Sequence, residues 1–137
     1  MSFIITRSGK HVNFVATDPS QIDIDDIAEG LSKECRFGGH CEGFYSVAQH
    51  SIHVAYILPP ELRLEGLLHD ATEAYMRDIP SPLKELLPDY GVLEHKLDAV
   101  IRATNVEAFS PCSQVQIQYV SSACTWFGSA SPRHSMK

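Results

Sequence analysis

Leu67-Leu68-His69-Asp70-Ala71-Thr72-Glu73-Ala74-Tyr75 carries three polar, metal-competent side chains into an otherwise apolar helical pattern. Burying an imidazole or a carboxylate without a partner costs several kcal/mol, so these groups are exposed, paired with one another, or hold a cation. Residues four apart on a helix face the same way, so His69 and Glu73 are expected to converge, with Asp70 one step round. Imidazole nitrogens and carboxylate oxygens are ordinary ligands of Zn, Mn, Fe or Co.

A second histidine lies on the preceding predicted helix. Helices are expected at about residues 46–58 and 61–76, and the proline pair between them makes them antiparallel neighbours. His50 and His69 are then expected at the same level along the pair of helices, about equally far from the turn that joins them. This geometry brings His50, His69 and Asp70 to one point and leaves open positions for water and substrate. The alternative is that His69 pairs with nearby carboxylates on a solvated face.

Further charged residues are candidates for binding a phosphate. Arg36 precedes Phe37-Gly38-Gly39, and a guanidinium binds phosphate in bidentate fashion. Asp78 follows the helix that carries Glu73, and Lys84 is a candidate second phosphate contact. The simpler interpretations are a surface arginine, a capping aspartate and a solvated lysine. The remaining lone histidines are expected to be structural: His40, His53 and His95.

Length and composition limit the function classes. The 137 residues make one domain, and a net charge of −6 disfavours binding to a nucleic acid polymer, although it does not exclude a single nucleotide. No apolar stretch is long enough for a membrane span, and the N-terminus lacks the pattern of a signal peptide. The four cysteines form no CxxC pair, so a reduced, cytoplasmic protein is expected.

The predicted fold is all-α with a short N-terminal β-hairpin. Strands are expected at Phe3–Thr6 and His11–Val15, where Gly9 supplies the turn. Besides the two helices above, helical patterns cover Asp23–Glu34, Pro82–Leu87 and Gly91–Ala103.

The composition changes near residue 107. All 17 acidic residues lie in the first 107 positions, whereas residues 108–137 are rich in serine and have no Asp or Glu. The chain is therefore divided into a domain at 1–107 and an atypical tail at 108–137. This change is consistent with a different structural role for the tail or with an altered reading frame.

The ordered set of motifs resembles the HD-domain metal-dependent phosphohydrolases. The resemblance is to phage and prophage members related to bacterial 5′-deoxynucleotidases and to phage dATP triphosphohydrolases, and it runs from about Ser2 to Arg102. Its main motifs are Cys35-Arg36-Phe37-Gly38-Gly39-His40, Phe44-Tyr45-Ser46-Val47-Ala48-Gln49-His50-Ser51, Leu67 to Tyr75, and Asp78-Ile79-Pro80-Ser81-Pro82-Leu83-Lys84.

The resemblance implies an HD-type helical bundle and one divalent ion such as Mn, Co or Zn. Its implied ligands are His50, His69 and Asp70. Deoxynucleoside mono- or triphosphates are the implied substrates. Related proteins form dimers or larger rings, so a homo-oligomer is one expectation, although no interface is evident in the sequence.

The resemblance also implies roles for four further residues. Glu73 matches the carboxylate that positions or activates the attacking water, and Asp78 matches a second acid beside the leaving oxygen. Arg36 matches the arginine that contacts the substrate phosphate. Lys84 falls in a Pro-x-Lys segment that supports a phosphate.

The family's fourth metal ligand is an aspartate on a later helix, and no acid follows Glu107 here. Local alignment places Cys124 at that position and Ser131 at a later glutamate. A thiolate can ligate Zn or Co, so Cys124 could complete a softer site. The favoured interpretation is instead that the tail is unrelated to the family, as a frameshift would produce. The alternative function is therefore a catalytically impaired remnant that binds metal or nucleotide without turnover.

Overall fold

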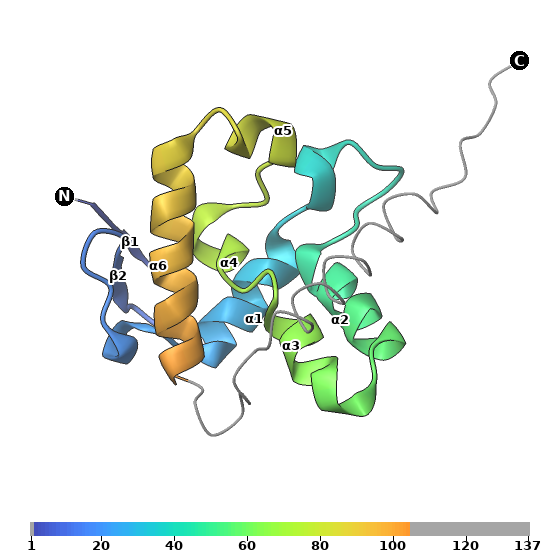
Figure 1. Cartoon of the computed structure of the whole chain (residues 1–137), viewed down its shortest axis with the longest axis horizontal. Helices are drawn as coiled ribbons and strands as arrows, with labels where there is room; N and C mark the ends of the chain where they lie inside the picture. Colours follow the sequence, from blue (N-terminus) through green and yellow to red (C-terminus); the bar gives the residue numbers. More distant parts are fainter. Residues whose placement is uncertain (1, 105–137) are drawn as a thin grey trace, which may run out of the picture.

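The computed structural model describes residues 2–104. This part of the chain is mostly helical with one antiparallel β-hairpin near the N-terminus, as the sequence predicts (Figure 1). None of its helices combines the length and apolar character needed to cross a bilayer. In chain order the elements are β1 (Phe3–Ile5), β2 (His11–Asn13), η1 (Pro19–Gln21), α1 (Ile24–Lys33), η2 (Arg36–Gly39), α2 (Val47–Ile57), η3 (Pro60–Leu62), α3 (Arg63–Leu68), α4 (Glu73–Met76), α5 (Ser81–Lys84) and α6 (Pro88–Thr104).

The N-terminal hairpin is confirmed, with shorter strands than predicted. Ile4 pairs with Val12, and Gly9 takes a φ of 85° in the connecting turn, a conformation that glycine adopts without steric cost. The turn is attached to α1, because Asp26 accepts hydrogen bonds from the Ser8 amide (3.0 Å) and the Ser8 hydroxyl (2.6 Å).

Side-chain caps fix where the longer helices begin. Ser46 caps α2 by accepting a hydrogen bond from the Gln49 amide at 3.1 Å, and Asp23 caps α1. The last helix starts at Pro88, three residues before the predicted start, because proline is well tolerated in the first helical turn. The short helix α5 spans only Ser81–Lys84.

The predicted continuous helix over residues 61–76 is wrong. The chain leaves the helix after α3, makes a turn over residues 69–72, and forms the one-turn helix α4. In the turn, backbone hydrogen bonds join residues three apart. The Ala71 amide donates to the Leu68 carbonyl and the Glu73 amide donates to the Asp70 carbonyl, each at 3.0 Å. His69 and Glu73 therefore do not share one helix face.

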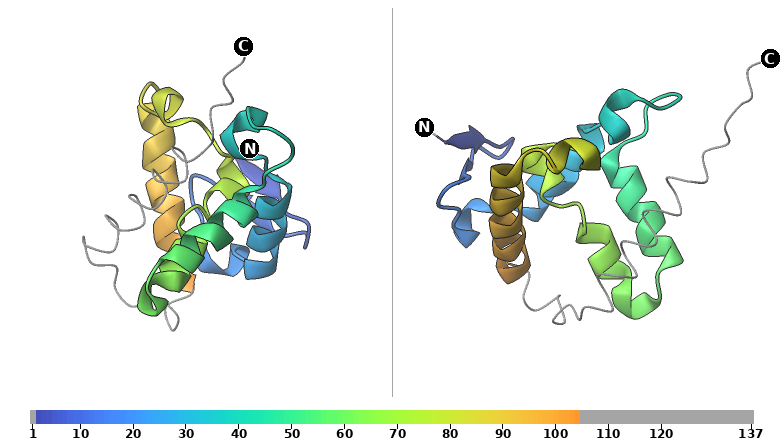
Figure 2. Two further views of the ribbon diagram at one scale, coloured as in Figure 1. Left: turned by 90° about the vertical axis from the view of Figure 1, so that its right-hand side faces the viewer. Right: turned by 45° about the horizontal axis from the view of Figure 1, so that its top comes forward.

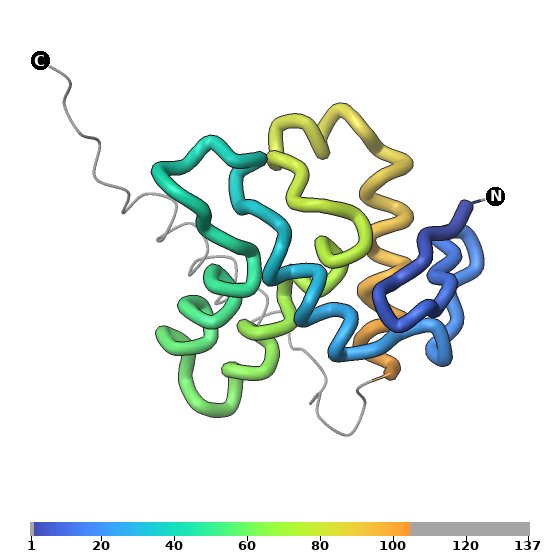
Figure 3. The backbone as a smooth tube through the Cα atoms, turned by 180° about the vertical axis from the view of Figure 1, so that it is seen from behind, coloured from blue at the N-terminus to red at the C-terminus, as the bar shows by residue number. Residues whose placement is uncertain are grey.

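Two clusters of apolar side chains form the core. The larger cluster joins the hairpin, α1, α4 and α6 around Ile27, Leu97 and Ile101, and one end each of α2 and α3 also packs into it. The smaller cluster consists of Val54, Leu58 and Leu62 at the other end of the α2–α3 pair. Figures 2 and 3 show α6 beside the hairpin and the α2–α3 pair on the opposite side of the molecule, with α1 between them. The turn over residues 69–72 lies between these two parts.

Candidate metal centre

The two histidines meet because α2 and α3 pack closely. A Cβ atom built on Gly66 would lie 3.2 Å from the Ala55 Cα and would overlap the Leu58 side chain, so any larger residue would require Leu58 and the α2 backbone to shift. The Nε2 atoms of His50 on α2 and His69 after α3 are consequently 3.2 Å apart. The predicted convergence of these two rings is confirmed.

Asp70 completes a triangle of metal-competent atoms. Its Oδ2 lies 3.0 Å from His69 Nε2 and 3.5 Å from His50 Nε2. Ligand atoms around a tetrahedral or octahedral ion with bonds of about 2.1 Å are separated by about 3.0–3.4 Å. The three edges of the triangle match these separations, so the His-His-Asp group could hold a metal ion.

The His69 ring presents a lone pair to this point. His69 Nδ1 lies 2.6 Å from the Gly66 carbonyl, which can only accept, so Nδ1 donates and Nε2 is left with its lone pair when the ring is neutral. His50 is 2% exposed, and burial, with the charge of Arg36, lowers its pKa to about 4. Both rings are therefore suited to be neutral metal ligands.

Arg36 lies beside the triad and contacts three carboxylates. Its Nη1 is 3.1 Å from Asp70 Oδ2, 3.3 Å from Glu73 Oε2 and 3.2 Å from Asp78 Oδ1, and the side chain is only 14% exposed. Burial opposes ionisation of Asp70, but His69 and the Arg36 charge outweigh it and hold the pKa of Asp70 below its usual value. Asp70 therefore remains a carboxylate.

The backbone around Arg36 fixes its position. The Arg36 amide donates to the Tyr45 carbonyl at 2.8 Å, and the next residue, Phe37, has a left-handed φ of 59°. The Phe37 amide donates to Asp78 Oδ2 at 2.8 Å. Asp78 itself follows Arg77, which has a φ of 77°. Two unusual backbone conformations thus hold the Arg36–Asp78 pair together.

Glu73 is the most perturbed acid of the site. It is 5% exposed, and burial together with the charges of Asp70 and Asp78 raises its pKa to about 9. Glu73 therefore carries a proton at neutral pH in this arrangement. A group that holds a proton so close to the ionised Asp70 is suited to general acid–base chemistry.

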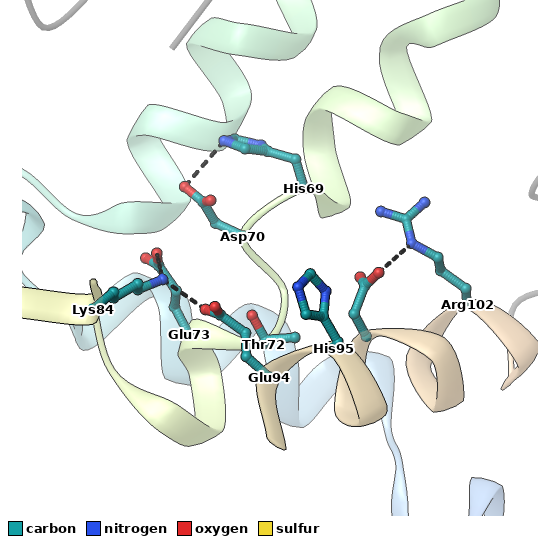
Figure 4. Close-up of a pocket in the computed structure, with 9 residues that line it drawn as sticks. His69, Asp70, Thr72, Glu73, Lys84, Glu94, His95 and Arg102 are labelled. Carbon is teal, nitrogen blue, oxygen red and sulfur yellow. Dashed lines mark hydrogen bonds and ion pairs between the residues drawn. The ribbon is translucent and has the colours of Figure 1, made fainter. Parts of the chain in front are cut away.

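Two cavities adjoin the triad. A cavity of about 540 Å³ is lined by Arg36, Asp78 and the segment from Ile79 to Pro82. A second cavity, of about 280 Å³, lies against α6 (Figure 4). Lys84 lines both, with its Nζ 2.6 Å from Glu94 Oε1 and 4.0 Å from Glu73 Oε1. The structure thus brings Arg36, Asp78 and Lys84 to the same region as the triad.

The contribution of α6 to this region is not predicted by the sequence motifs. His95, Asp98 and Arg102 line the second cavity, and Arg102 Nη1 also contacts the buried Glu65 at 2.7 Å. These three residues are spaced three and four positions apart, and this spacing could have indicated that they share one face of the helix. His95 was expected to be structural, but it faces this cavity.

The other singled-out residues lie outside the cluster or outside the described residues. His53 Nδ1 is 2.9 Å from the Tyr45 hydroxyl, and His40 follows η2 at its C-terminal end. Cys124, the candidate fourth ligand, lies outside residues 2–104, as does the tail at 108–137.

Comparison with known proteins gives two relatives and no matching family model. Over 102 residues the chain is 56% identical to the uncharacterized protein YfdR of Escherichia coli K12, covering 74% of this chain and 57% of YfdR. It is 34% identical over 104 residues to the uncharacterized protein RCAP_rcc00048 of Rhodobacter capsulatus, covering 69% of this chain and 53% of that protein. The chain thus spans little more than half the length of these relatives, and neither name states an activity.

Proposed function

We propose that this chain is a metal-dependent phosphohydrolase of the HD-domain type that hydrolyses deoxynucleoside mono- or triphosphates. The observation that carries the proposal is the triangle of His50, His69 and Asp70 atoms beside a buried arginine. Arg36 Nη1 lies 3.1 Å from the same Asp70 oxygen that belongs to the triangle. A cation and a phosphate group would therefore be bound side by side.

The residues present fit a divalent ion. Asp70 Oδ2 is buried and has no hydrogen-bonding partner in good geometry among residues 2–104, although three nitrogens lie within 3.5 Å of it. Two imidazoles and a carboxylate suit Zn, Co or Mn, and three protein ligands leave coordination positions open. When bound, such an ion polarises a phosphate oxygen and makes water more acidic.

The surrounding side chains would then bind the substrate and move protons. Arg36 exchanges its carboxylate contacts for phosphate oxygens and neutralises the charge that develops there. A bound ion would add positive charge near Glu73 and lower its pKa from about 9, so that Glu73 could orient the attacking water and accept a proton from it. Asp78, which lies against the Arg36 guanidinium, orients water beside the leaving oxygen, and Lys84 supports a phosphate.

The acid-free tail favours a second candidate, in which the same triad binds metal or nucleotide without turnover. All 17 acidic residues precede position 108, so no aspartate is available there as a fourth ligand. The two candidates differ in whether phosphate is released.

The test combines metal content with phosphate release. The purified chain is analysed for bound metal and assayed against deoxynucleoside mono- and triphosphates with added Mn, Co or Zn. We expect about one ion per chain and measurable hydrolysis. Asp70→Ala should abolish both, whereas the matched variant Asp25→Ala, at an exposed position on α1, should change neither.

Other outcomes distinguish the alternatives. Metal without turnover supports the non-catalytic candidate. Absence of both, with recovery in Cys124→Asp, shows a pocket that lacks one ligand. Absence of both without recovery contradicts the proposal.

A further inference from the structure

Two cysteine sulfurs lie close together at the base of the loop that carries Arg36. The Sγ atoms of Cys35 and Cys41 are 4.0 Å apart, and both residues are partly exposed and not joined by a disulfide. A disulfide requires about 2.0 Å between the sulfurs, so each sulfur must move by about 1 Å. Both thiols are therefore within reach of each other and of a small oxidant.

The chain between the two cysteines can absorb this movement. Gly38 and Gly39 have φ values of 60° and 84°, and glycine changes conformation at low steric cost. The Cys41 sulfur makes weak contacts with the Gly43 carbonyl at 3.4 Å and the Arg36 carbonyl at 3.8 Å, and it also interacts with the Tyr45 backbone. Bond formation would break no strong interaction of either sulfur.

The loop connects these sulfurs to the candidate metal centre. Cys35 forms a β-bridge with Ser46, and the adjacent Arg36 reaches Asp70 through its guanidinium. The Phe37 amide binds Asp78. A covalent ring from residue 35 to residue 41 would enclose both Arg36 and Phe37, and would restrict the backbone that positions the arginine.

We propose that Cys35 and Cys41 form a reversible dithiol–disulfide pair that fastens the Arg36 loop. The oxidant is a low-molecular-weight disulfide. One cysteine thiolate attacks it, forming a mixed disulfide and releasing one thiolate. The second cysteine thiolate attacks the protein sulfur of the mixed disulfide, forming the Cys35–Cys41 bond and releasing the other thiolate. Two protein thiols are oxidised, and the small disulfide is reduced to two thiols.

The sequence allows a direct test on the full chain. Trypsin cleaves after Lys33, Arg36 and Arg63, so Cys35 and Cys41 fall on separate peptides, 34–36 and 37–63. Only a disulfide joins these two peptides. The other cysteines, Cys112 and Cys124, lie together on peptide 103–133 and are distinguished by mass.

The folded chain is equilibrated with reduced and oxidised glutathione, acid-quenched, alkylated and mapped without reduction. We expect the joined peptides 34–36 and 37–63, with on the order of tenfold less of this product when the chain is unfolded in urea in the same buffer, because folding preorganises the sulfurs. The matched variants Cys35→Ser and Cys41→Ser should carry glutathione on the remaining cysteine and form no ring.

Three results would overturn the proposal: glutathione adducts without the ring, links from Cys35 or Cys41 to peptide 103–133, or equal ring formation in folded and unfolded chains.

Hydrogen exchange tests whether the disulfide restricts the Arg36 loop. Amides of residues 36–45 should exchange several-fold more slowly in the oxidised protein, with those of α6 unchanged. Unchanged or faster amide exchange in residues 36–45 would contradict the proposal that the disulfide fastens this loop. Neither readout requires metal binding or hydrolysis, so they are independent of the proposed function.

Discussion

Asp26 shows how one buried carboxylate attaches the N-terminal hairpin to the helices. Burial raises its pKa, but the hydrogen bonds from Ser8 and Thr6 and the charge of Lys10 outweigh this and hold the pKa below 3.8. Ionised Asp26 therefore contributes stability above that pH, and the contribution is lost as the pH falls through the lowered pKa of the folded state.

Asp26→Asn should lower the free energy of unfolding by about 1–3 kcal/mol at pH 7, because the Ser8 donors lose a charged acceptor. The difference from the wild type should shrink as the pH falls below 3.8, measured by urea unfolding across that range. The exposed neighbour Asp25→Asn is the control and should change little. An equal loss at low and neutral pH would contradict the assignment.

At the scale of single residues, the convergence of the triad could be predicted from the sequence, whereas the backbone conformations around it could not. The prolines after α2 make a helical pair, which brings His50 toward His69. The left-handed conformations of Phe37 and Arg77 carry no such signal, because neither residue type favours positive φ. The Phe37–Asp78 contact therefore emerged only from the folded chain.

At the scale of elements, the α2–α3 contact depends on Gly66. Gly66→Ala gains up to about 1 kcal/mol of helix propensity, but a Cβ there overlaps Leu58 and presses on Ala55, which costs about 1–3 kcal/mol. We expect net destabilisation and weaker metal binding, because the Gly66 carbonyl orients His69. Thermal unfolding and metal titration measure both effects.

Gly91→Ala is the matched control for this substitution. Gly91 lies in the first turns of α6, and nothing lies within 4 Å of a Cβ built there. This variant should be neutral or more stable by up to about 1 kcal/mol, with unchanged metal affinity. A destabilised Gly91→Ala, or a fully stable Gly66→Ala, would show that the packing distance is not the controlling factor.

The apolar pattern predicted the helices but not the break between α3 and α4. Leu64, Leu67, Leu68, Ala71 and Ala74 continue through it at helical spacing. The break depends on an interaction that spacing does not encode: the His69 ring donates to the Gly66 carbonyl, which a continuous helix would offer to the amide of residue 70. The residue that marks the site is thus also the one that ends the helix.

At the scale of the whole molecule, metal binding should stabilise the fold. An ion that binds only the folded chain adds about 2.7 kcal/mol at a free concentration one hundred times its Kd. We expect Mn, Co or Zn to raise Tm relative to a chelated sample and Asp70→Ala to lose this shift. Asp25→Ala should retain it. An equal rise in wild type and Asp70→Ala would indicate binding elsewhere.

Composition and periodicity predicted the mostly helical class, but not how α6 closes the second cavity. His95, Asp98 and Arg102 face the triad because α6 packs through Leu97 and Ile101 on its other side. That choice of face depends on long-range packing, which the pattern of one helix does not specify.

The division of the core gives the triad a topological role. The α2–α3 pair has a small cluster of its own, Val54, Leu58 and Leu62, whereas most buried side chains belong to the other cluster. An ion held by His50 and His69 would act as a cross-link that closes a loop between residues nineteen positions apart. Like a disulfide, it would stabilise the fold mainly by reducing the chain entropy of the unfolded state. Loss of the ion would then loosen α2 from α3, while Val47 and Leu68 still pack both helices against the larger core.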